Sequence, residues 1–209
     1  MVDGGGASIG YRHFHDELAA LKERLLEMSE QAESLVDVAV DALHTRDRVK
    51  AESVIAADQA LDQLEVEIED LAISMLALQQ PMARDLRFLV GAIKVSSDLE
   101  RVGDHAVNIA QCAVRLVEGH AIMPQTPVLP DMARRARGML SDALDAFIRG
   151  DGSLGRDVVR ADDAVDALHD GMYRSMVAAM SADARMIPAA LELLLVSRNL
   201  ERVADLATN

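Results

Sequence analysis

Apolar residues recur every three or four positions along almost the whole chain, which is the period of an amphipathic α-helix. The first stripe contains Phe14, Leu18 and Leu21 and leads to a helix end near Arg46. Proline and glycine residues interrupt the pattern at a few places and mark further helix ends. The pattern therefore predicts six helices, over about residues 14–46, 49–79, 82–118, 131–149, 153–180 and 188–209.

A segment with three prolines, residues 119–130, separates the first three helices from the last three. Such a composition is typical of a linker. The opening decapeptide, MVDGGGASIG, has neither the basic region nor the apolar core of a signal peptide. We therefore expect a flexible tail over residues 1–10, a three-helix bundle over 11–118, a linker over 119–130 and a second three-helix bundle over 131–209.

The two halves are also related in sequence. LERVGDHAVN (residues 99–108) aligns with LERVADLATN (residues 200–209), and seven of the ten positions are identical. VIAADQALDQL (residues 54–64) aligns with VVRADDAVDAL (residues 158–168), with six of eleven identical. Two matches in the same order indicate duplication of a three-helix unit. The predicted fold is all-α, with two tandem, sequence-related three-helix bundles.

Composition narrows the class of protein. Aromatic residues make up 2% of the chain, which disfavours a β-sandwich or barrel. The formal net charge of −14 argues against direct binding of nucleic acid, because the phosphate backbone is also negative. No apolar run approaches the ~20 residues that span a bilayer. The single cysteine, Cys112, favours a reducing compartment. We therefore expect a cytoplasmic protein.

Both repeats contain the pattern Glu-x-x-x-Asp-x-x-x-Asn, which we call the acid ladders. A spacing of four advances a helix by ~40° and ~6 Å, so the members of each ladder share one helix face. The first ladder is Glu100, Asp104 and Asn108, and the second is Glu201, Asp205 and Asn209.

Apolar residues occupy the same helix arc as each ladder, which predicts that the ladders point inward. These residues are Leu86, Val90 and Ile93 in the first repeat and Ile187, Leu191 and Leu194 in the second. Burying a charged carboxylate away from water costs several kcal/mol unless a nearby cation compensates for the lost hydration. Arg101 and Arg202 lie ~100° away on the wheel, which makes them poor partners for a whole ladder. Bound metal is the alternative, and oxygen ligands suit iron, manganese, magnesium or calcium.

The helix before each ladder carries further candidates. Asp58, Asp62 and Glu65 share one face, and Asp162, Asp166 and His169 repeat the pattern. These side chains either supply ligands from a facing helix or solvate the flank of the bundle, and the residues alone leave both readings open. No nucleophile motif, phosphate-binding glycine loop or zinc-finger spacing occurs, so an enzyme is not expected.

Taken together, the duplicated ladder motif, the run DLRFLVGAIK (residues 85–94) and the pattern D-x-x-L-D-x-L in the preceding helix resemble the PhoU family of phosphate-uptake regulators. The resemblance implies a pair of three-helix bundles, commonly a homodimer, with a multinuclear metal cluster in each repeat. Iron or zinc is implied first, with manganese or magnesium as alternatives. Glu100 and Asp104 would bind one cluster and Glu201 and Asp205 the other, with Asn108 and Asn209 as the family's following positions.

The family resemblance also implies a function. Such a protein is a cytosolic negative regulator of phosphate uptake and of the phosphate-starvation response. It couples the ATPase subunit of a phosphate ABC transporter to a sensor histidine kinase and reaches the membrane through these partners. Family members continue the last helix beyond the position of Asn209, so the second site could lack a ligand. The alternatives are a helical metalloenzyme and an accessory protein of another anion permease.

Overall fold

The computed structural model describes the backbone of residues 5–119 and 122–209. These residues form six α-helices and a one-turn 3-10 helix, and no β-strand occurs within them. The all-α prediction is therefore confirmed. The elements are α1 (Gly5–Thr45), α2 (Arg48–Gln79), α3 (Ala83–Glu118), α4 (Leu129–Arg149), α5 (Gly152–Ala182), η1 (Ala184–Met186) and α6 (Ile187–Ala207).

The start of α1 differs from expectation. The helix begins at Gly5, whereas the sequence predicts a flexible tail through residue 10. Residues 1–4 lie outside the described part. Once a helix has nucleated, each added residue gains a hydrogen bond, so a long and strongly periodic helix can extend into glycines that cost ~1 kcal/mol each.

The same cap starts the second helix of each repeat. Asp47 precedes α2, and its side chain accepts a hydrogen bond from the backbone N–H of Lys50. Asp151 precedes α5 and accepts from the backbone N–H of Ser153 and of Leu154. An aspartate at this position satisfies helix N–H groups that have no partner within the helix. The equivalent caps add a local signature of duplication to the aligned motifs.

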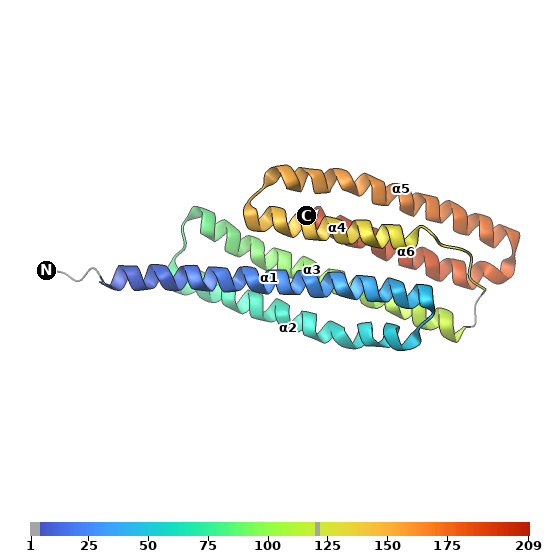
Figure 1. The fold of residues 1–209 in the computed structure, drawn as a ribbon, viewed down its shortest axis with the longest axis horizontal. Coiled ribbons are helices and arrows are strands. Elements are labelled where there is room, and N and C mark those ends of the chain that lie inside the picture. Colours follow the sequence, from blue (N-terminus) through green and yellow to red (C-terminus); the bar gives the residue numbers. More distant parts are fainter. Residues whose placement is uncertain (1–4, 120–121) are drawn as a thin grey trace.

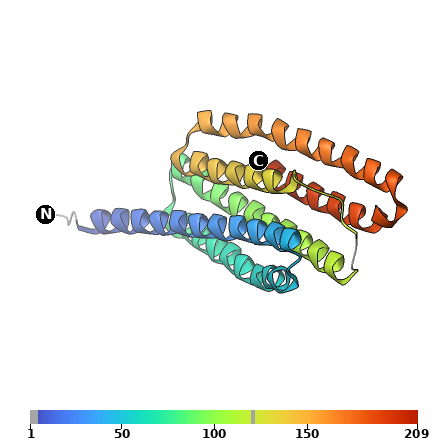
Figure 2. The same cartoon turned by 45° about the vertical axis from the view of Figure 1, so that its right-hand side comes forward.

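The six helices run roughly lengthwise, with α2 and α5 on opposite flanks and the other four between them (Figures 1 and 2). Each repeat forms a three-helix unit, and the units meet through contacts of α1 with α4 and of α3 with α6. No helix in the described part is both long and apolar enough to cross a membrane.

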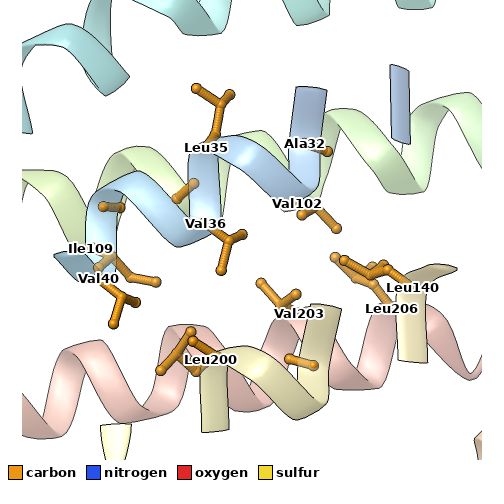
Figure 3. Packing of buried hydrophobic residues seen from close by; sticks show 14 of the residues in the cluster. Ala32, Leu35, Val36, Val40, Val102, Ile109, Leu140, Leu200, Val203 and Leu206 are labelled. Atoms are coloured by element: carbon orange, nitrogen blue, oxygen red, sulfur yellow. The ribbon is translucent and has the colours of Figure 1, made fainter. Parts of the chain in front are cut away.

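One continuous hydrophobic core joins the two units. Val36 of α1, Val102 of α3, Leu140 of α4 and Val203 of α6 approach one another across the junction (Figure 3). The exposed fraction of each is 5% or less. Helices α3 and α6 are therefore held on several sides, which fixes the position of the ladder that each carries.

Candidate metal centre

The first acid ladder faces acidic side chains of α2. The pKa of Glu100 is raised above its usual value, first by burial, then by Asp104 of the same ladder and then by Glu65, Asp62 and Asp58 of α2. These electrostatic effects require the carboxylates to lie near one another. The structure therefore brings the predicted ladder and the α2 acids into one group, which we call the first acid cluster (Asp58, Asp62, Glu65, Glu100 and Asp104).

A glycine allows this approach of α2 to α3. A Cβ atom added to Gly103 would lie 2.5 Å from Leu61 Cδ2 and 3.0 Å from Asp58 Oδ1. Real Cβ atoms do not approach carbon atoms so closely, so a larger residue would force the side chains of Leu61 and Asp58 to move. Gly103 thereby positions Asp58 against the ladder. Helical periodicity does not predict this role, although Gly103 lies inside the first ladder motif.

No basic side chain in the described part balances the first acid cluster in these interactions. Burial is the largest cause of the raised pKa values of Asp58 and Glu65, and neighbouring carboxylates add to it. A hydrogen bond from Ser97 lowers the pKa of Glu65 in part. Arg101 pairs instead with Asp98, at 3.1 Å between Nη1 and Oδ1. The expectation that Arg101 is a poor partner for the ladder is confirmed.

The second ladder faces α5 in the same way. Burial raises the pKa of Asp162, and Asp166, Asp205 and Glu201 raise it further. Asp162 Oδ1 is buried and has no hydrogen-bond partner within the described residues. A buried acceptor without a donor is costly, so this oxygen favours the presence of a further cation or donor. We call Asp162, Asp166, Glu201 and Asp205 the second acid cluster.

The second cluster differs from the first in having a base beside it. Arg202 Nη1 donates to Asp205 Oδ2 at 3.3 Å, and Arg202 Nε lies 3.9 Å from Glu201 Oε2. The prediction that Arg202 is a poor partner is therefore wrong. The wheel angle describes Cβ directions, whereas the long side chain of Arg202 reaches Asp205, three positions further along the helix.

His169 takes the place of Glu65 in the second repeat. Its Nδ1 lies 2.8 Å from Ser197 Oγ, and the Ser197 hydroxyl in turn lies 3.6 Å from Met132 Sδ. Because Ser197 is completely buried, this hydrogen bond fixes the imidazole against α6. His169 therefore joins α5 to α6, and its Nε2 is the ring nitrogen left for a ligand.

The prediction that the ladders point inward is only partly correct, because half of the ladder residues are exposed. Glu100, Glu201 and Asp205 are partly buried, but Asp104, Asn108 and Asn209 are exposed. Four of the six apolar residues on the same arcs are also exposed, with exposed fractions of 41% for Leu86 and 52% for Leu191. The other two, Ile93 and Leu194, are partly buried and pack against the core. Helical periodicity shows which residues share a face but not whether a neighbouring helix covers it. Here α2 and α5 cover only one side of each ladder.

The asparagines of the ladders have other surroundings. Asn108 lines a groove between α3 and α6. Asn209 Nδ2 donates to Asp98 Oδ1 at 3.5 Å. The structure therefore groups the Glu and Asp members of each ladder with the acids of the preceding helix, and it places the asparagines against different elements.

The donor set of both clusters fits a cation that prefers oxygen ligands. Carboxylates predominate, and Asp162 Oδ1 has no hydrogen-bond partner within the described residues. Asp62, Asp104 and Asp166 are exposed, whereas the other acids of the two clusters are partly buried. Within the described residues, no three His, Cys, Asp or Glu side chains already converge closely enough to hold a metal ion. Coordination would therefore require these side chains to turn toward one another.

Comparison with known families agrees with the internal repeat. The model described as the PhoU domain matches residues 25–113 and again residues 129–209, and each match contains one acid ladder. The chain belongs to the PhoU family. The family resemblance expected from the motifs is thereby confirmed.

PhoU relatives align over most of the chain. The phosphate-specific transport system accessory protein PhoU homolog of Caulobacter vibrioides is 39% identical over 198 residues, covering 95% of this chain and 86% of the relative. The homolog of Aquifex aeolicus is 38% identical, covering 89% of this chain and 84% of the relative.

Solved PhoU structures have the same fold. The crystal structure of PhoU from Pseudomonas aeruginosa superposes with a TM-score of 0.87 at 34% identity, covering 94% of each chain. The phosphate transport system regulatory protein PhoU from Streptococcus pneumoniae gives a TM-score of 0.86 at 30% identity, covering 94% of this chain and 92% of the other. These values confirm the predicted pair of related three-helix bundles.

Proposed function

We propose that this chain is a non-enzymatic, cytoplasmic accessory protein of a phosphate ABC transporter and a negative regulator of phosphate uptake. Its membership of the PhoU family over nearly the full length is the observation that carries this proposal. Relatives at 38–39% identity are described as accessory proteins of the phosphate-specific transport system. The Streptococcus pneumoniae structure is described as a regulatory protein of phosphate transport.

In this proposal the protein works through contacts. It binds the ATPase subunit of the transporter and a sensor histidine kinase, and it restrains the phosphate-starvation response when phosphate is plentiful. It reaches the membrane through these partners and assembles as a homodimer. Long helices with a continuous shared core support this role, because they present rigid surfaces to other proteins without needing a catalytic pocket.

Metal ions complete the proposed structure. Glu100 and Asp104 hold one centre, with Asp58, Asp62 and Glu65 facing them, and the second acid cluster with His169 holds the other. A bound cation supplies positive charge that offsets carboxylate repulsion. The carboxylates in turn orient α2 against α3 and α5 against α6. The oxygen-rich donor set favours iron, with manganese or magnesium next, and zinc fits best where His169 contributes nitrogen.

Complementation tests the proposed regulation. The chain would be expressed in a bacterium that lacks its own PhoU and carries a phosphate-starvation reporter. We expect the reporter to be repressed in high phosphate, and the transporter ATPase subunit to co-purify with the chain. A reporter that stays fully active despite soluble, folded protein would contradict the proposal.

A further inference from the structure

A groove of about 430 Å³ lies between the C-terminal half of α3 and the middle of α6, helices that adjoin each other in Figures 1 and 2. Each helix contributes one face to it, and so each repeat contributes half. None of its lining residues is acidic, although the chain has 35 acidic residues against 21 lysines and arginines. The lining residues are His105, Asn108, Cys112, Arg115, Leu195, Arg198, Asn199 and Arg202.

Arg198 is the unpaired cation of this groove. It is exposed, and within the described part it has no hydrogen bond or ion pair. An arginine side chain presents five N–H donors and remains charged at any physiological pH. In a protein with a net charge of −14, an arginine left without a carboxylate is free to bind an external anion.

Two further arginines of the groove are held in place by carboxylates and retain free donors. Arg115 donates from Nε and Nη2 to both carboxylate oxygens of Glu192, at 2.9 and 2.8 Å, and Nη2 also contacts Cys112 Sγ at 3.1 Å. Its Nη1 has no partner in the described part of the chain. Arg202 donates to Asp205 through Nη1. Because these side chains are already held in place, they lose less conformational entropy when a ligand binds.

A polar contact across the groove fixes its two walls. Asn199 Nδ2 donates to the backbone oxygen of Leu195, which leaves Asn199 Oδ1 to accept from His105 Nδ1 at 2.9 Å. The His105 ring is therefore held by an α6 residue. Asn108 is exposed beside it and provides an amide donor.

The repeat shows that packing does not require this basic character. In the register that aligns the two ladders, Arg198 corresponds to Ser97, Asn199 to Asp98 and His105 to Leu206. Asp98 and Leu206 instead line a mainly apolar groove elsewhere between the repeats. That second groove is also lined by α4 and α5. Packing of the duplicated helices therefore does not require Arg198, Asn199 or His105 at these positions.

From these contacts we infer that the α3–α6 groove binds a phosphoryl oxyanion, either inorganic phosphate or a phosphate monoester. Arginine donors match the geometry of phosphate oxygens, and bonds in which both partners are charged are the strong ones. A bound anion would bridge Arg115 of the first repeat and Arg198 of the second. Anion binding would therefore couple the two repeats at their junction, through residues of α3 and of α6.

Calorimetric titration of the full chain tests the inference. Inorganic phosphate, phenyl phosphate, sulfate and an unphosphorylated acidic peptide would be titrated at constant ionic strength. EDTA would be present throughout, so that phosphate bound through a metal ion does not contribute to the measurement. The key variant is Arg198→Ser, which installs the residue of the other repeat. Arg160→Ser is the matched control, because Arg160 lies on α5 outside the groove and removes the same charge.

We expect saturable binding of phosphate or phenyl phosphate that is tighter than binding of sulfate. Arg198→Ser should weaken it about tenfold, because a hydrogen bond to a charged group is lost, while Arg160→Ser should leave it unchanged. Preference for phosphate over phenyl phosphate would identify the free anion as the ligand, and the reverse would identify a monoester.

Failure to saturate up to about 10 mM of either phosphate compound, beyond the millimolar limit of weak specific binding, would overturn the inference. Equal weakening by Arg160→Ser would do the same, since it would indicate attraction by net charge alone. Binding of an acidic peptide without binding of phosphate would replace the inference with a protein-docking role. None of these results bears on repression in the complementation test, so the two proposals fail separately.

Discussion

The two acid clusters occupy equivalent places in the duplicated fold, yet they differ in how their charge is balanced. The first contains five carboxylates and no base from its own helices (Asp58, Asp62, Glu65, Glu100 and Asp104). In the second, His169 replaces one carboxylate and Arg202 pairs with Glu201 and Asp205. The backbone arrangement has been retained in both repeats while the electrostatics have diverged.

Because their charge is balanced differently, an added cation should stabilise the two clusters to different extents. Carboxylates that face one another without a base repel, and the repulsion grows as burial lowers the local dielectric. The first cluster therefore gains most from an added cation. In the second, Arg202 already supplies part of that positive charge and would compete with the proposed metal ion for Asp205.

The largest effect is expected at the contact between α2 and α3, where the first repeat has Gly103 and the second has Ala204. Gly103→Ala should destabilise the protein by about 1–3 kcal/mol, because the new Cβ would overlap Leu61 and displace Asp58. The second repeat already has alanine at this position. Ala204→Gly should cost about 1 kcal/mol from helix propensity, with a further loss because the methyl group of Ala204 is fully buried. Urea unfolding of both variants measures these values. A gain in stability for Gly103→Ala would contradict the close contact.

The next largest effect is expected when the arginine beside the second acid cluster is removed. Arg202→Ala should make the second cluster resemble the first, and its affinity for a divalent cation should rise about tenfold, roughly 1.4 kcal/mol. Without metal the same change should cost at most about 1 kcal/mol, since Arg202 is half exposed. Arg101→Ala is the matched control, because Arg101 pairs with Asp98. Equal gains in both variants would show that Arg202 has no specific role.

A smaller effect is the pH dependence of the metal-free protein. The pKa values of Asp58, Glu65 and Glu100 are raised in the folded state, so the folded state binds these protons more tightly than the unfolded state does. Stability from these groups is therefore present at acidic pH. It is lost as pH rises from the ordinary carboxyl pKa values through the raised ones.

Thermal unfolding in EDTA across this pH range checks the sign. Glu100→Gln should flatten the decline, whereas Asp142→Asn, at an exposed position of α4, should leave it in place. Stability that rises with pH through the same range and is unaffected by Glu100→Gln would show that the first cluster is not strained by its own charge.

The smallest effect concerns a thiol between the repeats. Burial, with a further contribution from Glu192, raises the pKa of Cys112 to about 12. Because the thiolate is the reactive form, alkylation at neutral pH should be slow in the folded protein and should become rapid in urea. The labelling rate would report separation of α3 from α6. Rapid labelling without denaturant would indicate that this junction is open.

The sequence predicted the helices well because their apolar residues repeat with a strong period of 3.6. The spacing from Asp58 to Glu65, repeated from Asp162 to His169, also indicated the faces that oppose the ladders. The exposure of Leu86 and Leu191 could not be predicted, since helical periodicity does not place neighbouring helices. The reach of Arg202 depends on a side-chain conformation. The groove beside Asn108 could not be predicted either, because it forms where α3 packs on α6 and these helices are distant in sequence.

Metal analysis of the purified protein tests the central claim, that the acid clusters are cation sites of unequal strength. Elemental analysis would compare the wild type with Glu100→Gln/Asp104→Asn, with Glu201→Gln/Asp205→Asn, and with Glu33→Gln/Asp37→Asn. The last pair has the same spacing on α1 but lies beside Arg137, which pairs with Asp37, so it serves as the control. The account predicts that each ladder variant loses the metal of its own cluster, that the second cluster empties first under mild chelation, and that the control is unchanged. Identical metal content in all four proteins would contradict it.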